Sequence, residues 1–225
     1  MKVIAIIPAR YASTRFPAKP LALLGGKPVI QRVYEKVAPL VDMAVVATDD
    51  ARIYDAVEAF NGRVVMTSTE HKSGTDRVFE AYKKITEALG TDYDVVINVQ
   101  GDEPFVQPST IRNVIKLLKK DKDADITTAC MPTLNLKDVE VPSHVKAVLT
   151  QDNRALYFSR AVVPFKRDIT EEVLAVPYYI HCGIYAYKKD ALEKFVNLPK
   201  SNLENLEKLE QLRALENGMI IKSIL

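Results

Sequence analysis

Small and basic residues are interleaved in the segment 8–21, PARYASTRFPAKPL. Its fixed positive charges are Arg10, Arg15 and Lys19, and small side chains such as Ser13 let a ligand approach the backbone N–H groups. A polyphosphate requires both features, because charged donors and backbone amides bind its oxygens. The segment matches neither G-x-x-x-x-G-K-[ST] nor G-x-G-x-x-G. It therefore predicts a phosphate-binding loop of another kind, with a solvated surface loop as the alternative.

Adjacent carboxylates follow a glycine in the segment 98–104, NVQGDEP. Asp102 could hold Mg²⁺ against a substrate phosphate, because Mg²⁺ typically binds one or two protein carboxylates together with phosphate oxygens and water. The alternative is an Asp that only forms hydrogen bonds within its own turn.

A third polar segment, 71–77, reads HKSGTDR. Ser73 followed by Asp76 fits the capping box of a helix N-terminus, and this structural interpretation already accounts for both residues. The free N–H groups of such a helix start could also bind an anion or a nucleotide base.

Short segments rich in Val and Ile must position these side chains, and they lie at residues 3–7, 43–48, 64–66, 95–99 and 126–131. Their apolar residues are consecutive, which indicates strands buried on both faces of a mostly parallel sheet. Helical patterns between the strands predict an α/β fold of three layers, with helix starts at Val29, Asp50, Ser73 and Pro108. In an open sheet of this kind, ligands bind beyond the carboxyl ends of the strands.

The pattern changes after Pro132. The segments 146–150, 155–159 and 178–187 predict strands set close together without a helix between each pair. We interpret residues 132–187 as a β-rich subdomain within a single domain that spans residues 1–225. Beyond it, leucines at every third position from Leu203 to Leu215 predict one core helix that Gly218 ends.

Composition excludes several classes of function. The formal net charge of +2 gives no electrostatic reason to expect nucleic acid as a partner. Cys130 and Cys182 are far apart, so neither a disulfide framework nor a zinc finger is indicated. The first apolar segment stops at Pro8, and no stretch approaches the roughly 18 apolar residues that span a membrane. We therefore expect a cytoplasmic protein without membrane insertion.

These segments together resemble the 3-deoxy-manno-octulosonate (KDO) cytidylyltransferase family over nearly the whole chain. The resemblance rests on the segments 7–15 (IPARYASTR), 19–21 (KPL), 73–77 (SGTDR), 96–104 (VINVQGDEP), 156–161 (LYFSRA), 181–187 (HCGIYAY) and 209–215 (LEQLRAL). Residues 11–15 also distinguish the chain from the related CMP-sialate synthetases, whose first loop is typically richer in Gly.

The resemblance implies a Rossmann-like nucleotidyltransferase fold and a reaction in which CTP and KDO give CMP-KDO and pyrophosphate for lipopolysaccharide biosynthesis. It assigns a catalytic role to Arg10, Lys19 and Asp102, with Asp102 as the ligand of a Mg²⁺ cofactor. The nucleotide-binding residues that it implies are Arg10, Ser13, Arg15, Lys19, Thr48, Ser73 and Arg77.

The sugar-binding residues implied by the resemblance are Gln100, Arg160, His181, Tyr185, Glu210 and Gln211. Their side chains offer donors for a carboxylate and acceptors for hydroxyl groups. Each also has a structural interpretation: His181 and Tyr185, on one face of a strand, could simply pack together, and Arg160 could form a surface ion pair. The β-rich subdomain is implied to pair with its copy in a homodimer.

The sequence departs from the family pattern at two places. Ala18 stands where the family usually has Gly, so the loop would be strained if that position needs a positive φ. The family also continues into a Val-Asp-Thr-Pro segment whose Asp is a second metal ligand, whereas this sequence stops at Leu225. With Asp102 alone, we expect Mg²⁺ to arrive largely bound to CTP.

Two alternatives stay open at this point. The nucleotide half of the site is better specified than the sugar half, so another sugar acid such as sialic acid could be the acceptor. The second alternative is a non-catalytic protein that binds the nucleotide without turning it over.

Overall fold

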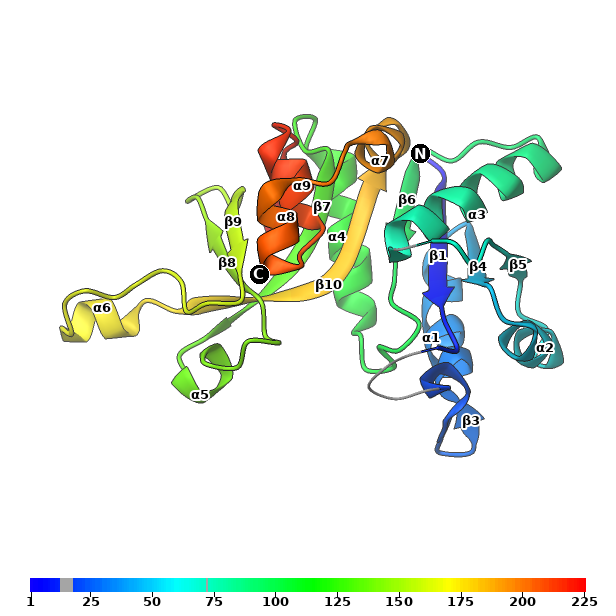
Figure 1. Cartoon of the computed structure of the whole chain (residues 1–225), viewed down its shortest axis with the longest axis horizontal. Helices are drawn as coiled ribbons and strands as arrows, with labels where there is room; N and C mark the ends of the chain where they lie inside the picture. The colour runs from blue at the N-terminus through cyan, green and yellow to red at the C-terminus, as the bar shows by residue number, and fades with distance from the viewer. Residues whose placement is uncertain (13–17, 72) are drawn as a thin grey trace.

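The computed structural model describes residues 1–12, 18–71 and 73–225. Its central sheet has nine strands, and the main path runs in the order β11-β7-β10-β6-β1-β4-β5 (Figure 1). These strands are β1 (Val3–Ala9), β4 (Met43–Thr48), β5 (Val64–Met66), β6 (Val95–Asn98), β7 (Ile126–Thr133), β10 (Tyr178–Lys188) and β11 (Ile221–Ile224). Along this path only β10 runs against its neighbours, β6 and β7, so the prediction of a mostly parallel α/β sheet is confirmed.

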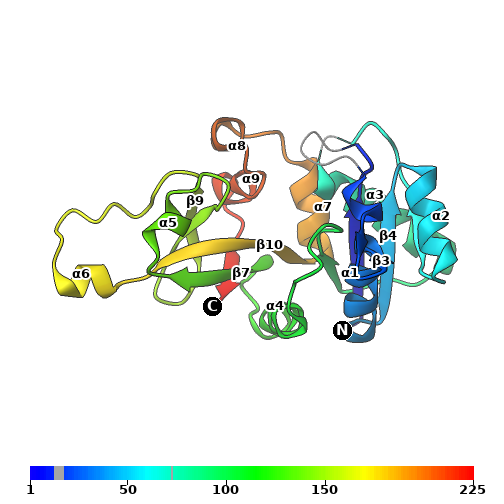
Figure 2. The same ribbon diagram turned by 90° about the horizontal axis from the view of Figure 1, so that it is seen from below.

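Two hydrophobic cores cover the two faces of the sheet. One contains residues of α3 (Gly74–Leu89), α7 (Lys189–Asn197) and α9 (Gln211–Glu216), and the other contains residues of α1 (Val29–Val37), α2 (Ala51–Ala59) and α4 (Pro108–Lys120). Figure 2 shows α7 and α9 on one side of the sheet and α4 on the other. β1 is buried along its whole length because alternate residues enter opposite cores, which explains its unbroken apolar sequence.

The helix boundaries agree with the expected start signals. The Asp50 carboxylate accepts a hydrogen bond from the Arg52 N–H, and the Ser73 hydroxyl accepts one from the Asp76 N–H. Such N-caps satisfy backbone donors that the helix itself leaves free. The short elements between β1 and β4 are η1 (Lys19–Leu21), β2 (Leu23–Leu24), β3 (Lys27–Pro28) and η2 (Ala38–Leu40).

The segment after β7 extends away from the parallel sheet (Figure 1). β8 (Lys146–Leu149) pairs with β9 (Ala155–Ser159) and with β10, all antiparallel, as expected for the β-rich segment. The structure adds two short helices, α5 (Leu136–Val139) and α6 (Glu171–Ala175). The prediction that no helix separates these strands is therefore wrong between β9 and β10, where the Thr170 hydroxyl caps α6.

The single leucine-rich helix expected near the end of the chain is also wrong. The structure has α8 (Asn202–Glu207) and α9, and between them Lys208 adopts a left-handed conformation with φ 55°. A leucine at every third position drifts around a helix of 3.6 residues per turn, so one straight helix could not bury them all. Leu206 accordingly remains exposed, whereas Leu209 and Leu212 are buried. Gly218, with φ 73°, follows the end of α9.

Candidate active site

Lys19 and Asp102 meet at the carboxyl-end edge of the sheet, although they are far apart in sequence. The Lys19 Nζ atom lies 2.9 Å from Asp102 Oδ2. Gly101 lets the chain after β6 pass close to β1, because a Cβ atom there would lie 2.8 Å from the Pro8 carbonyl oxygen. The structure thus joins the predicted phosphate loop and the predicted metal ligand, and both side chains are partly open to solvent.

Ala18, directly before Lys19, has φ 59° and ψ 16°. Its N–H group donates to the Tyr11 carbonyl oxygen at 2.9 Å, which closes the loop onto itself. The condition for strain at this position is therefore met, and an alanine with a positive φ carries strain that a glycine would not. Ser13 and Arg15, both predicted to bind phosphate, lie outside the described residues.

Arg10 follows β1 directly and reaches the start of α3. One guanidinium nitrogen, Nη2, donates to the carbonyl oxygen of His71 at 2.5 Å and to that of Ser73 at 3.3 Å. Burial lowers the pKa of Arg10, and the nearby guanidinium of Arg77 lowers it further. The carboxylates of Asp49, Asp76 and Glu210 act in the opposite direction, so Arg10 lies among groups of both charges.

Arg77 and Thr48 are fully buried, so neither side chain faces a free surface. The Arg77 guanidinium donates to Thr67 Oγ1 and to the Asp49 carboxylate, while the Thr48 hydroxyl accepts from the Asp50 N–H. The structure therefore places Arg77 behind Asp49 rather than along an open nucleotide site. Asp49 was not predicted, and its position at the carboxyl end of β4 was the signal that could have identified it.

Glu210 links the start of α3 to the start of α9. Its carboxylate accepts a hydrogen bond from Thr75 Oγ1, and the Ser73 hydroxyl also bonds to it. Burial raises the pKa of Glu210. Gln211, the next residue, is buried at the first position of α9. The structure thus brings predicted nucleotide and sugar residues together, and Thr75 is a site residue that sequence reasoning missed.

His181 and Tyr185 lie on the same face of β10, as their spacing predicted, with ring centroids 5.2 Å apart. His181 also packs edge-on against Phe158, and its Nε2 atom lies 2.9 Å from Thr128 Oγ1. Burial lowers the pKa of His181 to about 4, so the ring is neutral near pH 7. The Gln100 amide bonds to Asn98 Oδ1 at the end of β6.

Arg160, predicted to bind the sugar, caps the end of α8 in this structure. Its Nε atom donates to the Glu207 carbonyl oxygen at 2.7 Å, and its two terminal nitrogens donate to the carbonyl oxygens of Lys208 and Pro142. The Glu207 carboxylate in turn accepts from the Arg160 N–H and from the Ser159 hydroxyl. These hydrogen bonds, rather than the surface ion pair considered from the sequence, connect β9 to α8. Glu207 had no recognisable signal in the sequence.

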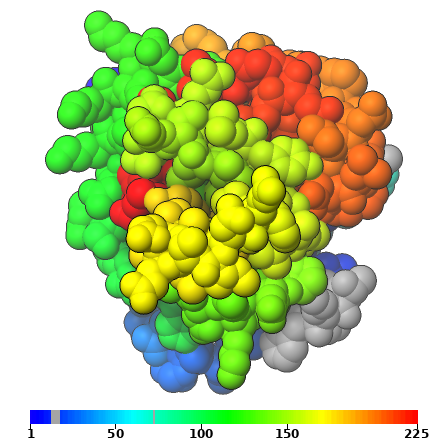
Figure 3. All heavy atoms as spheres, turned by 90° about the vertical axis from the view of Figure 1, so that its left-hand side faces the viewer, coloured from blue at the N-terminus to red at the C-terminus, as the bar shows by residue number. Residues whose placement is uncertain are grey.

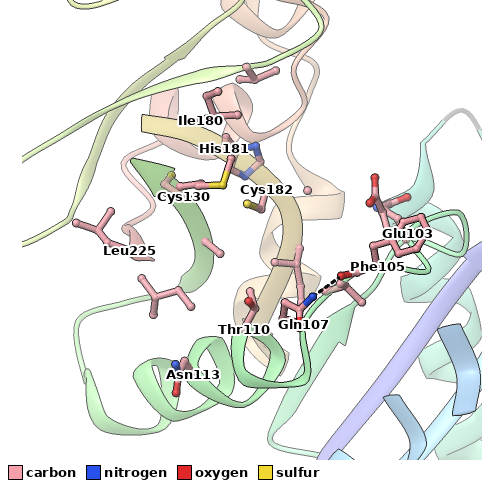
Figure 4. A pocket seen from close by; sticks show the side chains of 18 of the residues that line it. Glu103, Phe105, Gln107, Thr110, Asn113, Cys130, Ile180, His181, Cys182 and Leu225 are labelled. Atoms are coloured by element: carbon pink, nitrogen blue, oxygen red, sulfur yellow. Dashed lines mark hydrogen bonds between the residues drawn. The ribbon is translucent and has the colours of Figure 1, made fainter. Parts of the chain in front are cut away.

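A cavity of about 770 Å³ opens beside these residues. Figure 4 shows Glu103 and Phe105 from the loop after β6, Thr110 and Asn113 from α4, and Cys182 from β10 around it. Gln100 and His181 also line this cavity, whereas Arg10, Lys19 and Asp102 do not. The charged pair therefore lies on the open edge of the sheet, and the cavity lies beside it.

The fit of a divalent metal can be tested on the donors that the structure describes. Within residues 1–12, 18–71 and 73–225, no group of three or more His, Cys, Asp and Glu side chains is arranged to hold a metal ion. Asp102 is partly exposed and bonded to an ammonium group, so it can serve as one carboxylate ligand. This arrangement fits Mg²⁺ that brings most of its oxygen ligands with it, from phosphate and water.

The fold and the site define a class of enzyme. The carboxyl edge of the open α/β sheet carries Arg10, Lys19 and Asp102, a set of side chains suited to a nucleoside triphosphate. The model of the cytidylyltransferase family matches residues 4–224. The chain belongs to this cytidylyltransferase family. Among the described residues, no helix is both long enough and apolar enough to cross a membrane.

Particular relatives are similar over almost the whole chain. A 3-deoxy-manno-octulosonate cytidylyltransferase of Elusimicrobium minutum is 56% identical over 99% of this chain and 89% of its own length. An 8-amino-3,8-dideoxy-manno-octulosonate cytidylyltransferase of Shewanella frigidimarina is 48% identical, again over 99% of this chain and 89% of its own length. A solved structure of CMP:2-keto-3-deoxy-manno-octonic acid synthetase in complex with CTP is 39% identical, with a TM-score of 0.91 over 100% of this chain and 89% of that one.

Proposed function

We propose that this chain transfers the cytidylyl group of CTP to the anomeric hydroxyl of KDO, giving CMP-KDO and pyrophosphate for lipopolysaccharide biosynthesis. The relatives named above support this substrate pair, since they are similar over nearly all of this chain. The observation that carries the proposal is the contact between Lys19 and Asp102, which joins a phosphate-binding cation to a metal-binding carboxylate.

The chemistry needs no nucleophile from the protein. The anomeric oxygen attacks the α-phosphorus of CTP, the bond between the α-phosphorus and the bridging oxygen breaks, and the hydroxyl proton leaves to solvent. Catalysis then consists of positioning and charge neutralisation. Arg10 and Lys19 are placed to bind the triphosphate and to offset the negative charge that builds on the departing pyrophosphate.

Asp102 would hold Mg²⁺ in this scheme, and the ion would supply further neutralisation of the phosphate charge. Before CTP binds, the Lys19 ammonium group pairs with the Asp102 carboxylate. With CTP bound, Lys19 would be free to pair with a phosphate oxygen, and Asp102 would be the residue that holds the metal. Mg²⁺ is thus the cofactor that the donor set fits.

The sugar site is proposed at Gln100, His181, Tyr185, Glu210 and Gln211. Arg160 belongs to it only if its guanidinium leaves the carbonyl oxygens that it now caps. The named relatives act on KDO or on its 8-amino analogue by their names, which favours an octulosonate over sialic acid.

We also propose a homodimer and a cytoplasmic location, where CTP is available. Figure 3 looks onto the surface around α6, and exposed apolar side chains of this segment include Val162, Phe165, Ile169 and Val176. Such a patch is typical of an interface between protein chains. We expect a dimer mass by light scattering, and Phe165→Asp combined with Ile169→Asp should give a monomer; a monomeric parent chain would contradict the dimer.

The test of the substrate assignment is a comparison of sugars in one assay. The chain is incubated with CTP and Mg²⁺ together with KDO, its 8-amino analogue or sialic acid, and the nucleotide sugar is identified by mass spectrometry. We expect CMP-KDO as the main product. Preference for the 8-amino sugar would mean that the substrate is a different octulosonate. Exclusive use of sialic acid would overturn the assignment.

A further inference from the structure

The anchor of Arg10 depends on the loop that precedes α3. Its guanidinium donates to the carbonyl oxygens of His71 and Ser73. A main-chain carbonyl can orient a side chain only as well as its own segment is held. The Ser73 end is held by the N-cap of α3, where its hydroxyl accepts from the Asp76 N–H at 3.1 Å.

The His71 end is held by Glu80, which lies on α3 away from the expected phosphate site. The Glu80 carboxylate bonds to the His71 Nε2 atom and accepts from the Ser68 N–H at 3.0 Å. It also pairs with the Lys84 ammonium group at 2.7 Å. Burial alone would raise the pKa of Glu80, but the hydrogen bonds from Lys84, Ser68 and His71 and the charge of Lys84 outweigh it and lower the pKa to about 2, so Glu80 is ionised throughout the neutral range.

We propose that Glu80 is a positioning residue for Arg10, acting through His71. The Glu80 carboxylate bonds to both the His71 ring and the Ser68 N–H group. It thereby holds the His71 carbonyl group, which accepts a hydrogen bond from Arg10. This inference rests on the proposed function, in which Arg10 binds the triphosphate of CTP. Glu80 itself touches none of the predicted sugar-site residues among its hydrogen-bond and ion-pair partners in the described part of the chain.

Fixing Arg10 matters because its surroundings pull it in several directions. The neighbouring Arg77 repels it, whereas the carboxylates of Asp49, Asp76 and Glu210 attract it, so a released Arg10 side chain would turn away from the carbonyl oxygens that now hold it. A side chain that must be ordered again on binding costs affinity. Loss of Glu80 should therefore weaken the binding of CTP more than the binding of the sugar.

The experiment measures CTP binding by calorimetry and the KM values of CTP and KDO for the full chain with Mg²⁺. Glu80→Ala removes the tie, Glu80→Gln keeps an oxygen that can accept from the Ser68 N–H, and His71→Ala keeps the carbonyl group but loses its anchor. Glu87→Ala, exposed on the same helix, is the matched control. Urea unfolding of each variant separates loss of fold from loss of positioning.

We expect Glu80→Ala to raise the Kd and KM of CTP about tenfold, well short of the hundredfold loss that a shift of about 1 Å can cause. The KM of KDO should stay unchanged, Glu80→Gln should recover most of the affinity, and Glu87→Ala should match the parent chain. The double variant of Glu80→Ala and His71→Ala should bind CTP no more weakly than the weaker single variant, because both changes cut one connection.

Equal losses for both substrates, or additive losses in the double variant, would overturn the proposal. Unchanged CTP affinity in a folded Glu80→Ala chain would overturn it as well. Failure of the proposed function looks different, because the parent chain would then lack turnover with CTP and KDO before any substitution is made.

Discussion

At the scale of single residues, the site depends on side chains that meet across large distances in sequence. Lys19 and Asp102 could be predicted individually, from the cations after β1 and the carboxylates after β6. Glu207 could not, because its importance comes from partners that only the fold brings near. Arg160 was assigned to the sugar site by the family resemblance, and the structure gives it carbonyl oxygens as partners.

Replacing Asp102 should lower the catalytic rate and leave the stability of the fold nearly unchanged. We expect Asp102→Asn to lower kcat by at least about a hundredfold, comparable to the loss of one charge-stabilising group in other enzymes. Its ion pair with Lys19 is partly exposed, so the free energy of unfolding should change by less than about 1 kcal/mol. Steady-state kinetics and urea unfolding check both expectations, with the exposed Asp123→Asn as a control. A fully active variant would remove Asp102 from the metal site.

Ala18 offers a test of backbone strain in the phosphate loop. Its left-handed conformation costs about 1–2 kcal/mol for a residue with a Cβ atom, and the extra freedom of a glycine in the unfolded chain costs about 0.5–1 kcal/mol. Ala18→Gly should therefore stabilise the chain by roughly 0.5–1 kcal/mol, measured by urea unfolding. A destabilised Ala18→Gly chain would show that the loop does not carry this strain.

At the scale of helices and strands, local patterns predicted the parallel sheet well because its strands are buried on both faces. The predicted segment 3–7 became β1 with every residue buried. The same reasoning failed at the leucine repeat, where the break at Lys208 depends on tertiary contacts. Arg160 supplies the donors for the carbonyl oxygens that the break exposes, and no local signal encodes that contact.

The packing of α8 against α9 should depend on the charge of Glu204. The buried Arg213 guanidinium makes two hydrogen bonds to the Glu204 carboxylate, at 2.8 and 2.7 Å. Glu204→Ala leaves the cation buried and unpaired, so we expect a loss of about 3–5 kcal/mol in the free energy of unfolding. The exposed Asn205→Ala should have little effect in the same urea titration. A loss below about 1 kcal/mol for Glu204→Ala would mean that Arg213 finds other partners.

At the scale of the whole molecule, a half-buried neutral histidine predicts a pH dependence of stability. The folded pKa of His181, about 4, lies below its usual value of 6.5, so the unfolded chain binds more protons between these values. His181 therefore contributes full stability above about pH 6.5, and this contribution is lost as the pH falls toward 4. Carboxylates with lowered pKa values, such as Glu80 and Asp152, lose their contribution to stability at a still lower pH.

The measurement is urea unfolding of the parent chain and of His181→Gln from pH 7 to pH 4.5. We expect the parent chain to lose stability more steeply than the variant over this range, because Gln does not titrate. Parallel curves would mean that folding does not lower the pKa of His181, and would contradict the effect expected from its packing against Phe158 and Tyr185.

The most direct test of the central claim is the release of pyrophosphate by the purified chain with CTP, KDO and Mg²⁺. Control reactions omit KDO, replace CTP with UTP, or remove Mg²⁺ with a chelator. The proposed reaction predicts release that requires KDO, prefers CTP and stops without the metal. Release without KDO, or no release from a folded chain that binds CTP, would contradict cytidylyl transfer to this sugar.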